Sequence, residues 1–314
     1  MEEALYSDLG FFNTDQVRSD KEGDFLTSPE VSKYFGKIIR NWIHSESNLK
    51  NIIEIGSGTG SLIEQIGIKE ITAVELSSTA REELIKKGID THTTIDELTT
   101  KTSDLIFGNE ILDNIPCSIG LYKDEGWYEK VVLLEENSLA YGLRPIRNEE
   151  LDWINKNNIV PNEDYEFEIQ VNIDKFLNSV IKKINPEKIL LFDYGYEQKN
   201  RDKRMYSSLL RTYKNHHLSV DPIDDPGNVD ITYDVNFSSI SSELKYLGYD
   251  VTLKLQRDFL LDNGFNIFFD ELQEKYIDAE GIEKLKINSE LNGMKAIVDS
   301  NGLGGFYCLI AEKL

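Results

Sequence analysis

The feature that most constrains the fold is a short apolar run that stops at a glycine-rich loop. Residues 51–55 (Asn-Ile-Ile-Glu-Ile) are typical of a buried parallel strand, and the loop 56–60 (Gly-Ser-Gly-Thr-Gly) follows directly. Glycines let the backbone turn tightly and approach a ligand, and the first turn of a helix offers free N–H groups. This order therefore predicts a ligand site at the carboxyl end of the strand.

The alternation of strand and helix patterns continues along the chain. Apolar runs predict strands at 51–55, 71–75, 104–108, 188–193, 249–255 and 305–311. Helical spacing of apolar residues predicts helices at 28–43, 78–87 and 239–247, and a helical segment at 259–287. Alternation of this kind predicts an α/β fold, Rossmann-like, with helices on both faces of a doubly wound sheet.

The pattern changes between Ser118 and about Asn185, where short strand-like pieces replace the alternation. We expect this part to leave the sheet as an inserted lobe that shapes the substrate site. We predict an N-terminal helical segment over the cofactor site at residues 1–47. The core is formed by residues 48–117 and 186–314, and the inserted lobe by residues 118–185.

An acidic residue, Glu75, ends the next predicted strand about 20 residues after the first loop glycine. A carboxylate at this offset can accept hydrogen bonds from both hydroxyls of a ribose. A dinucleotide site would place glycine at position 61, where this chain has Ser61, so an oxidoreductase is disfavoured. The loop and Glu75 together favour an adenosine ligand without a pyrophosphate, which is typical of class I S-adenosylmethionine (SAM) methyltransferases.

Three polar residues, Asn109, Glu110 and Asp113, follow the predicted strand 104–108. Ligands bind outside the carboxyl ends of such strands, so these side chains are placed to face the transferable methyl group. Glu110 and Asp113 share one face if the segment is helical, and two carboxylates could hold a guanidinium and ease removal of its proton. An acid that caps a helix start is an equally good explanation of the pattern.

The composition narrows the class of partner. The chain has 34 Lys+Arg and 56 Asp+Glu, a formal net charge of −22, which disfavours nucleic acid and anionic membrane surfaces as partners. A cationic ligand, a cationic peptide and mere solubility all remain compatible with this charge.

Other features predict a soluble cytoplasmic protein. Cys117 and Cys308 are far apart, the N-terminus has neither an apolar core nor Arg-rich character, and no apolar run approaches the ~18 residues of a membrane span. The pair His216 and His217 could indicate a metal site, but it lacks the HxH or HxxxH spacing, so we expect no metal.

Several blocks in one order resemble the family of SAM-dependent methyltransferases that includes MidA and mitochondrial complex I assembly factor 7. The resemblance covers about residues 5 to 255. The block 23–32 (Gly-Asp-Phe-Leu-Thr-Ser-Pro-Glu-Val-Ser) is its most specific part. The other similar blocks are the loop at 54–62, the segment 109–116 (Asn-Glu-Ile-Leu-Asp-Asn-Ile-Pro), and the stretches 193–195, 210–217 and 230–237.

The resemblance implies a class I SAM-dependent methyltransferase sheet and a protein arginine N-methyltransferase that works by direct displacement at the sulfonium methyl. We expect the cofactor to be bound by Glu54, Gly56, Gly58, Gly60, Glu75 and Asn109. Asn109, Glu110 and Asp113 are the expected catalytic residues, and Asp24 and Glu30 are expected to close over the cofactor or bind the acceptor.

Two other functions remain open. A methyltransferase of small molecules would use the inserted lobe to shape a closed apolar pocket, in place of an open acidic groove. A SAM-binding assembly protein would bind the cofactor without turnover. The acceptor, the number of methyl groups added and the oligomeric state are not determined by the sequence.

Overall fold

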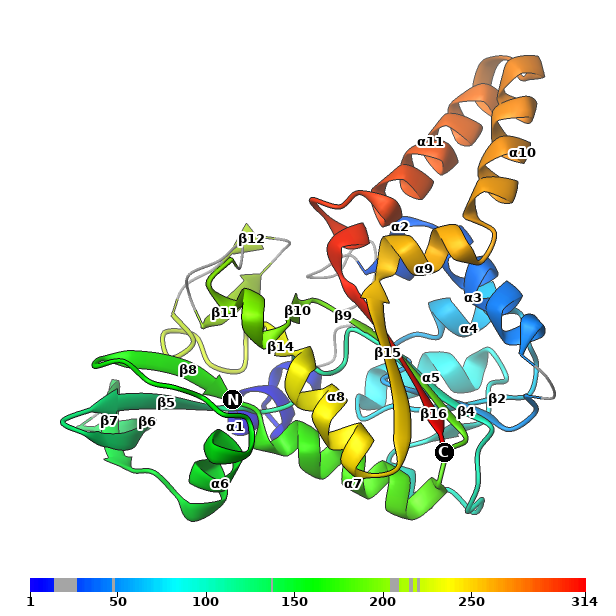
Figure 1. The fold of residues 1–314 in the computed structure, drawn as a ribbon. Helices are drawn as coiled ribbons and strands as arrows, with labels where there is room; N and C mark the ends of the chain where they lie inside the picture. Colours follow the sequence, from blue (N-terminus) through cyan, green and yellow to red (C-terminus); the bar gives the residue numbers. More distant parts are fainter. Residues whose placement is uncertain (14–26, 47–48, 137, 204–208, 215–216, 219–220) are drawn as a thin grey trace.

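The computed structural model of the chain describes residues 1–13, 27–46, 49–136, 138–203, 209–214, 217–218 and 221–314. Its centre is a seven-stranded sheet (Figure 1). From one edge to the other, the strands are β15 (Tyr249–Leu255), β16 (Tyr307–Lys313), β9 (Lys188–Asp193), β4 (Leu105–Asn109), β1 (Ile52–Ile55), β2 (Ile71–Val74) and β3 (Thr91–His92).

The order of the strands creates a crevice in the middle of this sheet. Neighbouring strands from β9 to β3 are parallel, whereas β16 runs antiparallel to both β9 and β15. The chain leaves β1 to form β2 on one side and later returns to form β4 on the other side. A sheet with this reversal opens a crevice beyond the carboxyl ends of β1 and β4. The predicted Rossmann-like α/β class is confirmed.

Strand residues alternate between two apolar layers, because successive side chains of a strand point to opposite faces. Ile52 packs in one layer and Ile53 in the other, and Phe192 and Leu191 divide in the same way. One layer includes residues of α3 (Tyr34–Ser45), α4 (Ser61–Ile66), α5 (Ser78–Lys86) and α9 (Gln256–Asp262). The opposite layers include residues of α7 (Val171–Ile184) and α8 (Phe237–Tyr246).

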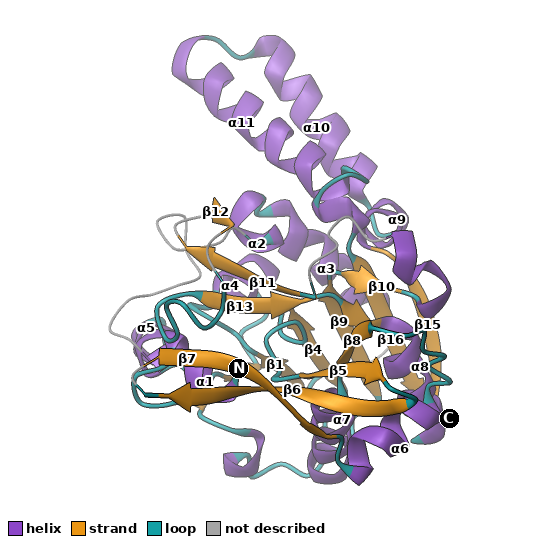
Figure 2. Ribbon diagram, turned by 90° about the vertical axis from the view of Figure 1, so that its left-hand side faces the viewer, coloured by secondary structure: helices purple, strands orange, loops and turns teal. Residues whose placement is uncertain are grey.

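A separate antiparallel sheet lies to one side of the central sheet (Figures 1 and 2). Its order is β7 (Ser138–Pro145), β6 (Gly126–Glu135), β5 (Ser118–Lys123) and β8 (Tyr165–Ile169), with α6 (Asn148–Lys156) packed on β8. The following helix α7 packs on the central sheet. The use of this sheet as a substrate lobe stays a prediction.

The chain between β9 and α8 is more regular than the sequence pattern indicates. No strand or helix is predicted there from apolar spacing. The residues nevertheless pair as β10 (Gly195–Tyr196) with β14 (Val235–Asn236) and as β11 (Leu210–Lys214) with β12 (His217–Leu218) and β13 (Asp230–Tyr233). These strands bury polar residues such as Arg211 and Asp230, so they lack the apolar alternation that identifies a strand.

The predicted helix 28–43 is divided into α2 (Ser28–Val31) and α3. Ser32 ends α2 with an extended backbone (φ −150°), and its hydroxyl accepts a hydrogen bond from the N–H of Tyr34 over 3.3 Å. Serine competes with the helix for backbone hydrogen bonds, which explains why apolar spacing alone missed this break.

The C-terminal helical segment also differs in detail from its prediction. It comprises α9, α10 (Phe265–Asp278) and α11 (Gly281–Val298), and α10 and α11 form a hairpin that projects from the body of the protein (Figures 1 and 2). At the N-terminus, α1 (Glu2–Tyr6) lies near the inserted sheet.

Among the residues that the structure describes, no helix combines the length and the apolar character needed to span a membrane. Within the same residues, no group of three or more His, Cys, Asp and Glu could hold a metal ion. His216 lies outside the described residues.

Replacing Phe192 tests how much the packing of α3 and α9 on strand β9 contributes to the stability of the protein. Its ring lies 5.1 Å from that of Phe35 in α3 and 5.2 Å from that of Phe259 in α9. We expect Phe192→Ala to lower the free energy of unfolding in urea by about 3–5 kcal/mol, because it leaves a cavity among three elements. Leu134→Ala, at a side chain that is 75% exposed, should change it by less than about 0.5 kcal/mol, and equal losses would contradict this account.

Candidate active site

A cavity of about 570 Å³ lies at the carboxyl ends of β1, β2 and β4. Its volume falls in the range of small-molecule sites, which is about 300–1,000 Å³. The glycine loop, the ends of three strands, α2 and the N-terminal segment all line it. Lining residues used below are Tyr6, Phe12, Thr27, Glu30, Glu54, Gly56, Gly58, Glu75, Asn109, Glu110, Pro116 and Asn172.

The loop 56–60 forms the floor of the cavity with a backbone that needs glycine. Gly56, Gly58 and Gly60 have φ angles of 70°, 51° and 84°, which side chains disfavour. The N–H of Gly56 donates to the carbonyl of Val74 over 2.8 Å, which ties the loop to β2. A Cβ at Gly56 would lie 2.3 Å from Cγ2 of Ile111. Gly56 and Gly58 line the cavity and Gly60 does not, so the backbone of the loop forms part of the cavity surface.

Glu75 follows β2 and is held by backbone N–H groups. Its Oε2 accepts from Gly58 over 2.8 Å, and its Oε1 accepts from Ser77 over 2.7 Å. Burial in the site raises the pKa of Glu75, while these two hydrogen bonds act in the opposite direction. The carboxylate is therefore fixed in place beside the loop, as its position in the sequence predicts.

Glu54, in β1, brings a second carboxyl group to the cavity. The side chain is 2% exposed, and its Oε2 has no hydrogen-bond partner among the described residues. Burial raises the pKa of Glu54 well above its ordinary value. A buried polar atom without a partner is costly, so Glu54 suits a site where a ligand supplies the missing donor.

Glu110 lies where β4 ends, and its backbone is strained. Its φ angle is 53°, which is rare for a residue other than glycine and is found often at functional sites. Its Oε1 accepts from the amide of Asn109 over 3.0 Å and from the N–H of Ser28 over 3.3 Å. Burial and the nearby Asp113 raise the pKa of Glu110 to about 8.

Asp113 does not share a surface with Glu110. The segment after β4 is not helical, so the expectation that the two carboxylates lie on one helical face is wrong. Asp113 is buried, is absent from the cavity lining and accepts a hydrogen bond from the hydroxyl of Tyr194. Burial raises its pKa to about 6, and the hydrogen bond from Tyr194 opposes this rise. Asp113 therefore lies behind the cavity wall.

The N-terminal block reaches the cavity through α2. Thr27 and Glu30 form a capping box, in which Oε2 of Glu30 accepts from the N–H and the hydroxyl of Thr27 over 2.9 and 3.0 Å. Both residues line the cavity, and the charge of Glu30 contributes to the raised pKa of Glu110. Asp24, the other expected residue of this block, lies outside the described residues.

Two aromatic residues of the cavity were missed by the sequence analysis. The rings of Tyr6 and Phe12 stack with centroids 5.5 Å apart, and the hydroxyl of Tyr6 donates to the carbonyl of Asn114 over 3.1 Å. Both belong to the first turns of the chain, where no motif marks them. The close spacing of Tyr6, Phe11 and Phe12 in the sequence is the one feature that indicates a packed N-terminal segment.

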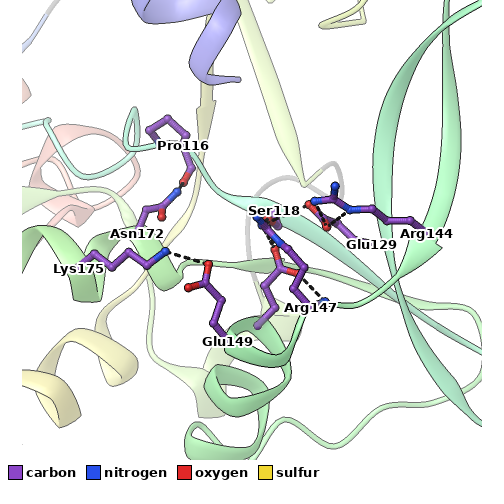
Figure 3. A network of polar contacts seen from close by, with 9 residues as sticks. Pro116, Ser118, Glu129, Arg144, Arg147, Glu149, Asn172 and Lys175 are labelled. Carbon is purple, nitrogen blue, oxygen red and sulfur yellow. Dashed lines mark hydrogen bonds and ion pairs between the residues drawn. The ribbon is translucent and has the colours of Figure 1, made fainter.

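The cavity lining includes Pro116, just before β5 of the inserted sheet, and Asn172 at the start of α7. Figure 3 shows the polar contact between them. The amide of Asn172 donates to the carbonyl of Pro116 over 2.8 Å, where the chain leaves the core. Beyond this point, Arg144 of β7 pairs with Glu129 of β6, and Arg147 pairs with Glu150 at the start of α6. Lys175 of α7 pairs with Glu149 of α6, so an ion pair joins the inserted part to a helix of the central sheet.

The charge of the lining suits a cationic ligand. The described lining residues include five glutamates, Glu2, Glu30, Glu54, Glu75 and Glu110, and no Lys, Arg or His. Like charges in one site raise each other's pKa unless a cation neutralises them. A SAM molecule carries a sulfonium and an ammonium group, so the glutamates and the exposed loop backbone fit this cofactor.

The raised pKa of Glu110 predicts a dependence of stability on pH. The folded protein holds this proton more tightly than the unfolded chain, so the free energy of unfolding should fall between about pH 4.5 and about pH 8. We expect Glu110→Gln to flatten the fall in the free energy of unfolding across this window. A slope remains from other buried carboxyl groups with raised pKa values, among them Glu54, Glu75, Asp113 and Asp193. Glu82→Gln, on the exposed side of α5, gives the baseline, and an identical slope in both variants would contradict the prediction.

Comparisons with known proteins agree with this geometry. The sequence pattern of a family described as "putative S-adenosyl-L-methionine-dependent methyltransferase" matches residues 36–252. A crystallised protein of Burkholderia thailandensis with bound S-adenosyl-homocysteine superposes with a TM-score of 0.83 at 22% identity, over 100% of this chain and 86% of that one. This likeness confirms the fold.

Two curated relatives are named "protein arginine methyltransferase NDUFAF7 homolog, mitochondrial". The protein of Caenorhabditis elegans is 25% identical over 303 residues, which cover 81% of this chain and 68% of the relative. The protein of Drosophila melanogaster is 24% identical over 281 residues, and this chain spans only 60% of its length. The resemblance to the MidA family is thereby confirmed.

The expected cytoplasmic location is contradicted by these relatives, which are named as mitochondrial proteins. That expectation rested on the composition of the first residues, on the two distant cysteines and on the lack of a long apolar run. The family match covers more than half of the chain and agrees with the acidic cavity and its glycine loop. The chain therefore belongs to this family, and it is a methyltransferase that depends on S-adenosylmethionine.

Proposed function

We propose that this methyltransferase transfers a methyl group to an arginine side chain of a protein, by direct displacement at the sulfonium. The observation that carries the proposal is the strained, half-buried Glu110 at the cavity, with a pKa raised to about 8 and a second carboxyl group, Glu30, nearby. The names of the curated relatives support an arginine acceptor.

The cofactor half of the cavity is assigned to the loop and the acids around it. Gly56 and Gly58 would carry the methionine part of SAM, with Glu54 taking a hydrogen bond from its ammonium group. Gly60 is outside the lining and would act by turning the loop into α4. Glu75 would accept hydrogen bonds from the ribose hydroxyls, because backbone N–H groups already fix its orientation. The bound cofactor supplies an electrophilic methyl group on a positively charged sulfur.

The acceptor half is assigned to Asn109, Glu110 and Glu30. The Oδ1 of Asn109 is buried and, in the part of the chain that the structure describes, has no hydrogen-bond partner, so it can accept from a guanidinium N–H. Glu110 has a pKa close to neutral, which suits a group that takes up the proton released as the new N–C bond forms. Asp113 would act indirectly, through its charge on Glu110.

Labelling tests the acceptor directly. We expect radiolabelled SAM, incubated with the protein and a lysate of cells that lack it, to label a small number of proteins, with mass spectrometry locating the methyl group on arginine. Glu110→Gln should bind SAM and lose most of the labelling, because it keeps the shape of the side chain and removes the base.

Each other outcome of this experiment identifies a different function. Label on lysine or on another residue would overturn the arginine assignment. Label confined to small molecules would favour the small-molecule methyltransferase. Intact SAM binding without any labelled product would favour the assembly protein without turnover.

A pair of glycine variants tests the loop as the cofactor site. Gly56 and Gly88 have similar φ angles of 70° and 73°, but a Cβ at Gly88 would meet no atom within 4 Å. Backbone strain should cost both Gly→Ala changes about 1–2 kcal/mol of stability. At Gly56 the new Cβ must also displace Ile111, which lines the cavity. In calorimetry with S-adenosyl-homocysteine, only Gly56→Ala should lose affinity, and equal affinities would argue against this part of the loop.

A further inference from the structure

One buried amide, Gln256, joins the C-terminal helices to the edge of the cavity. Gln256 begins α9 and is fully buried. Its Nε2 donates to the carbonyl of Ile297 in α11 over 3.0 Å, and its backbone N–H donates to the carbonyl of Phe306 over 2.7 Å. Its Oε1 accepts from the hydroxyl of Ser28, the first residue of α2, over 3.2 Å.

The same serine holds Glu110. While the Ser28 hydroxyl donates to Gln256, its backbone N–H donates to Oε1 of Glu110 over 3.3 Å. Ser28 is itself fully buried, so neither group can exchange its partner for water without movement of α2. A continuous chain of hydrogen bonds therefore runs from α11 through Gln256 and Ser28 to the carboxyl group of Glu110.

Close packing fixes α2 from two further sides. The amide of Gln65 in α4 donates to the carbonyl of Pro29 over 2.6 Å. On the other side α11 comes so near that a Cβ at Gly293 would lie 2.5 Å from the carbonyl oxygen of Val31. Helix α2 packs against α11, and Figure 1 shows it below that helix. With these contacts on several sides, a small displacement of one neighbour must move α2.

We propose that Gln256 is a positioning residue for Glu110, through which the C-terminal helices set the acceptor end of the cavity. The proposal rests on the proposed role of Glu110 at the acceptor. It gives a function to the segment 256–298, which contributes no residue to the cavity lining. Gln256 acts at a distance, because it contacts Ser28 and not the cavity itself.

The test follows the ionisation of Glu110, which does not depend on the identity of the acceptor. Glutamates are labelled with carbon-13 at the carboxyl group, and Glu110→Gln identifies the resonance. Burial keeps the pKa of Glu110 at about 8, with Asp113 and Glu30 adding to the rise. The hydrogen bond from the Ser28 N–H lowers this pKa, so its loss would act against the effect of water entry. Because burial is the largest cause of the raised pKa, we expect Gln256→Leu and Ser28→Ala, which move α2 and admit water, to lower it toward that of an exposed glutamate.

Binding and turnover give the second measurement. The glycine loop and Glu75 do not contact Gln256, so the affinity for S-adenosyl-homocysteine should stay unchanged in both variants. In the labelling experiment at saturating SAM, the initial rate of labelling should fall by about tenfold to a hundredfold, as expected when a reacting group is misplaced. Ser28→Thr keeps the hydroxyl and the N–H, and it should retain both the pKa of Glu110 and the rate of labelling.

A matched control separates positioning from simple loss of stability. Tyr249 is equally buried, and its hydroxyl donates to the carbonyl of Pro186 over 2.7 Å, away from α2. Tyr249→Phe also removes one buried hydrogen bond, so it should lower the melting temperature in the same way and leave the pKa of Glu110 alone. If Gln256→Leu behaves like Tyr249→Phe, the positioning role is wrong, even where arginine labelling succeeds.

A third variant moves α2 without removing any hydrogen bond. Gly293→Ala favours the helical state of α11, but the new Cβ must push the carbonyl of Val31 away. We expect the pKa of Glu110 to fall as in Gln256→Leu. An unchanged pKa in Gly293→Ala and in Ser28→Ala would overturn the proposal, whether or not arginine proves to be the acceptor.

Discussion

The rest of the site depends on one electrostatic constraint, the gathering of carboxyl groups in a cavity that has no described basic residue in its lining. Carboxylates in such a place must be oriented by hydrogen bonds, protonated or neutralised by a ligand. Glu75 is oriented by hydrogen bonds from two backbone N–H groups, and Glu110 has a pKa of about 8, which favours its protonated form. The Oε2 of Glu54 is buried and has no described partner, so this carboxyl group suits neutralisation by a cationic ligand.

The topology of the sheet explains why these groups meet. Parallel strands place their carboxyl ends at one edge of the sheet. Because β2 and β4 are added on opposite sides of β1, that edge opens between β1 and β4. Gly56 is bound to the end of β2, so the loop lies across the crevice and offers its backbone to the ligand. The left-handed backbone of Glu110 then bends the chain out of β4, which carries its side chain along the cavity wall.

Segments that are far apart in the sequence complete the wall. The first turns bring Tyr6, α2 brings Glu30, and the base of the inserted sheet brings Pro116. The C-terminal helices stay outside the lining and pack against α2, and in our proposal they support the acceptor end. In the proposed arrangement, the strand ends and the glycine loop hold the cofactor, and the peripheral elements surround Glu110.

The sequence by itself determined the α/β alternation, the loop glycines and the position of Glu75, because each depends on local periodicity or on a fixed spacing along the chain. It did not predict that Asp113 turns away from Glu110 toward Tyr194, or that Ser32 interrupts the first long helix. It also gave no sign of Gln256. Only the tertiary structure decided these points, because the partners of a buried polar group are chosen by packing between segments distant in the chain, which no local pattern records.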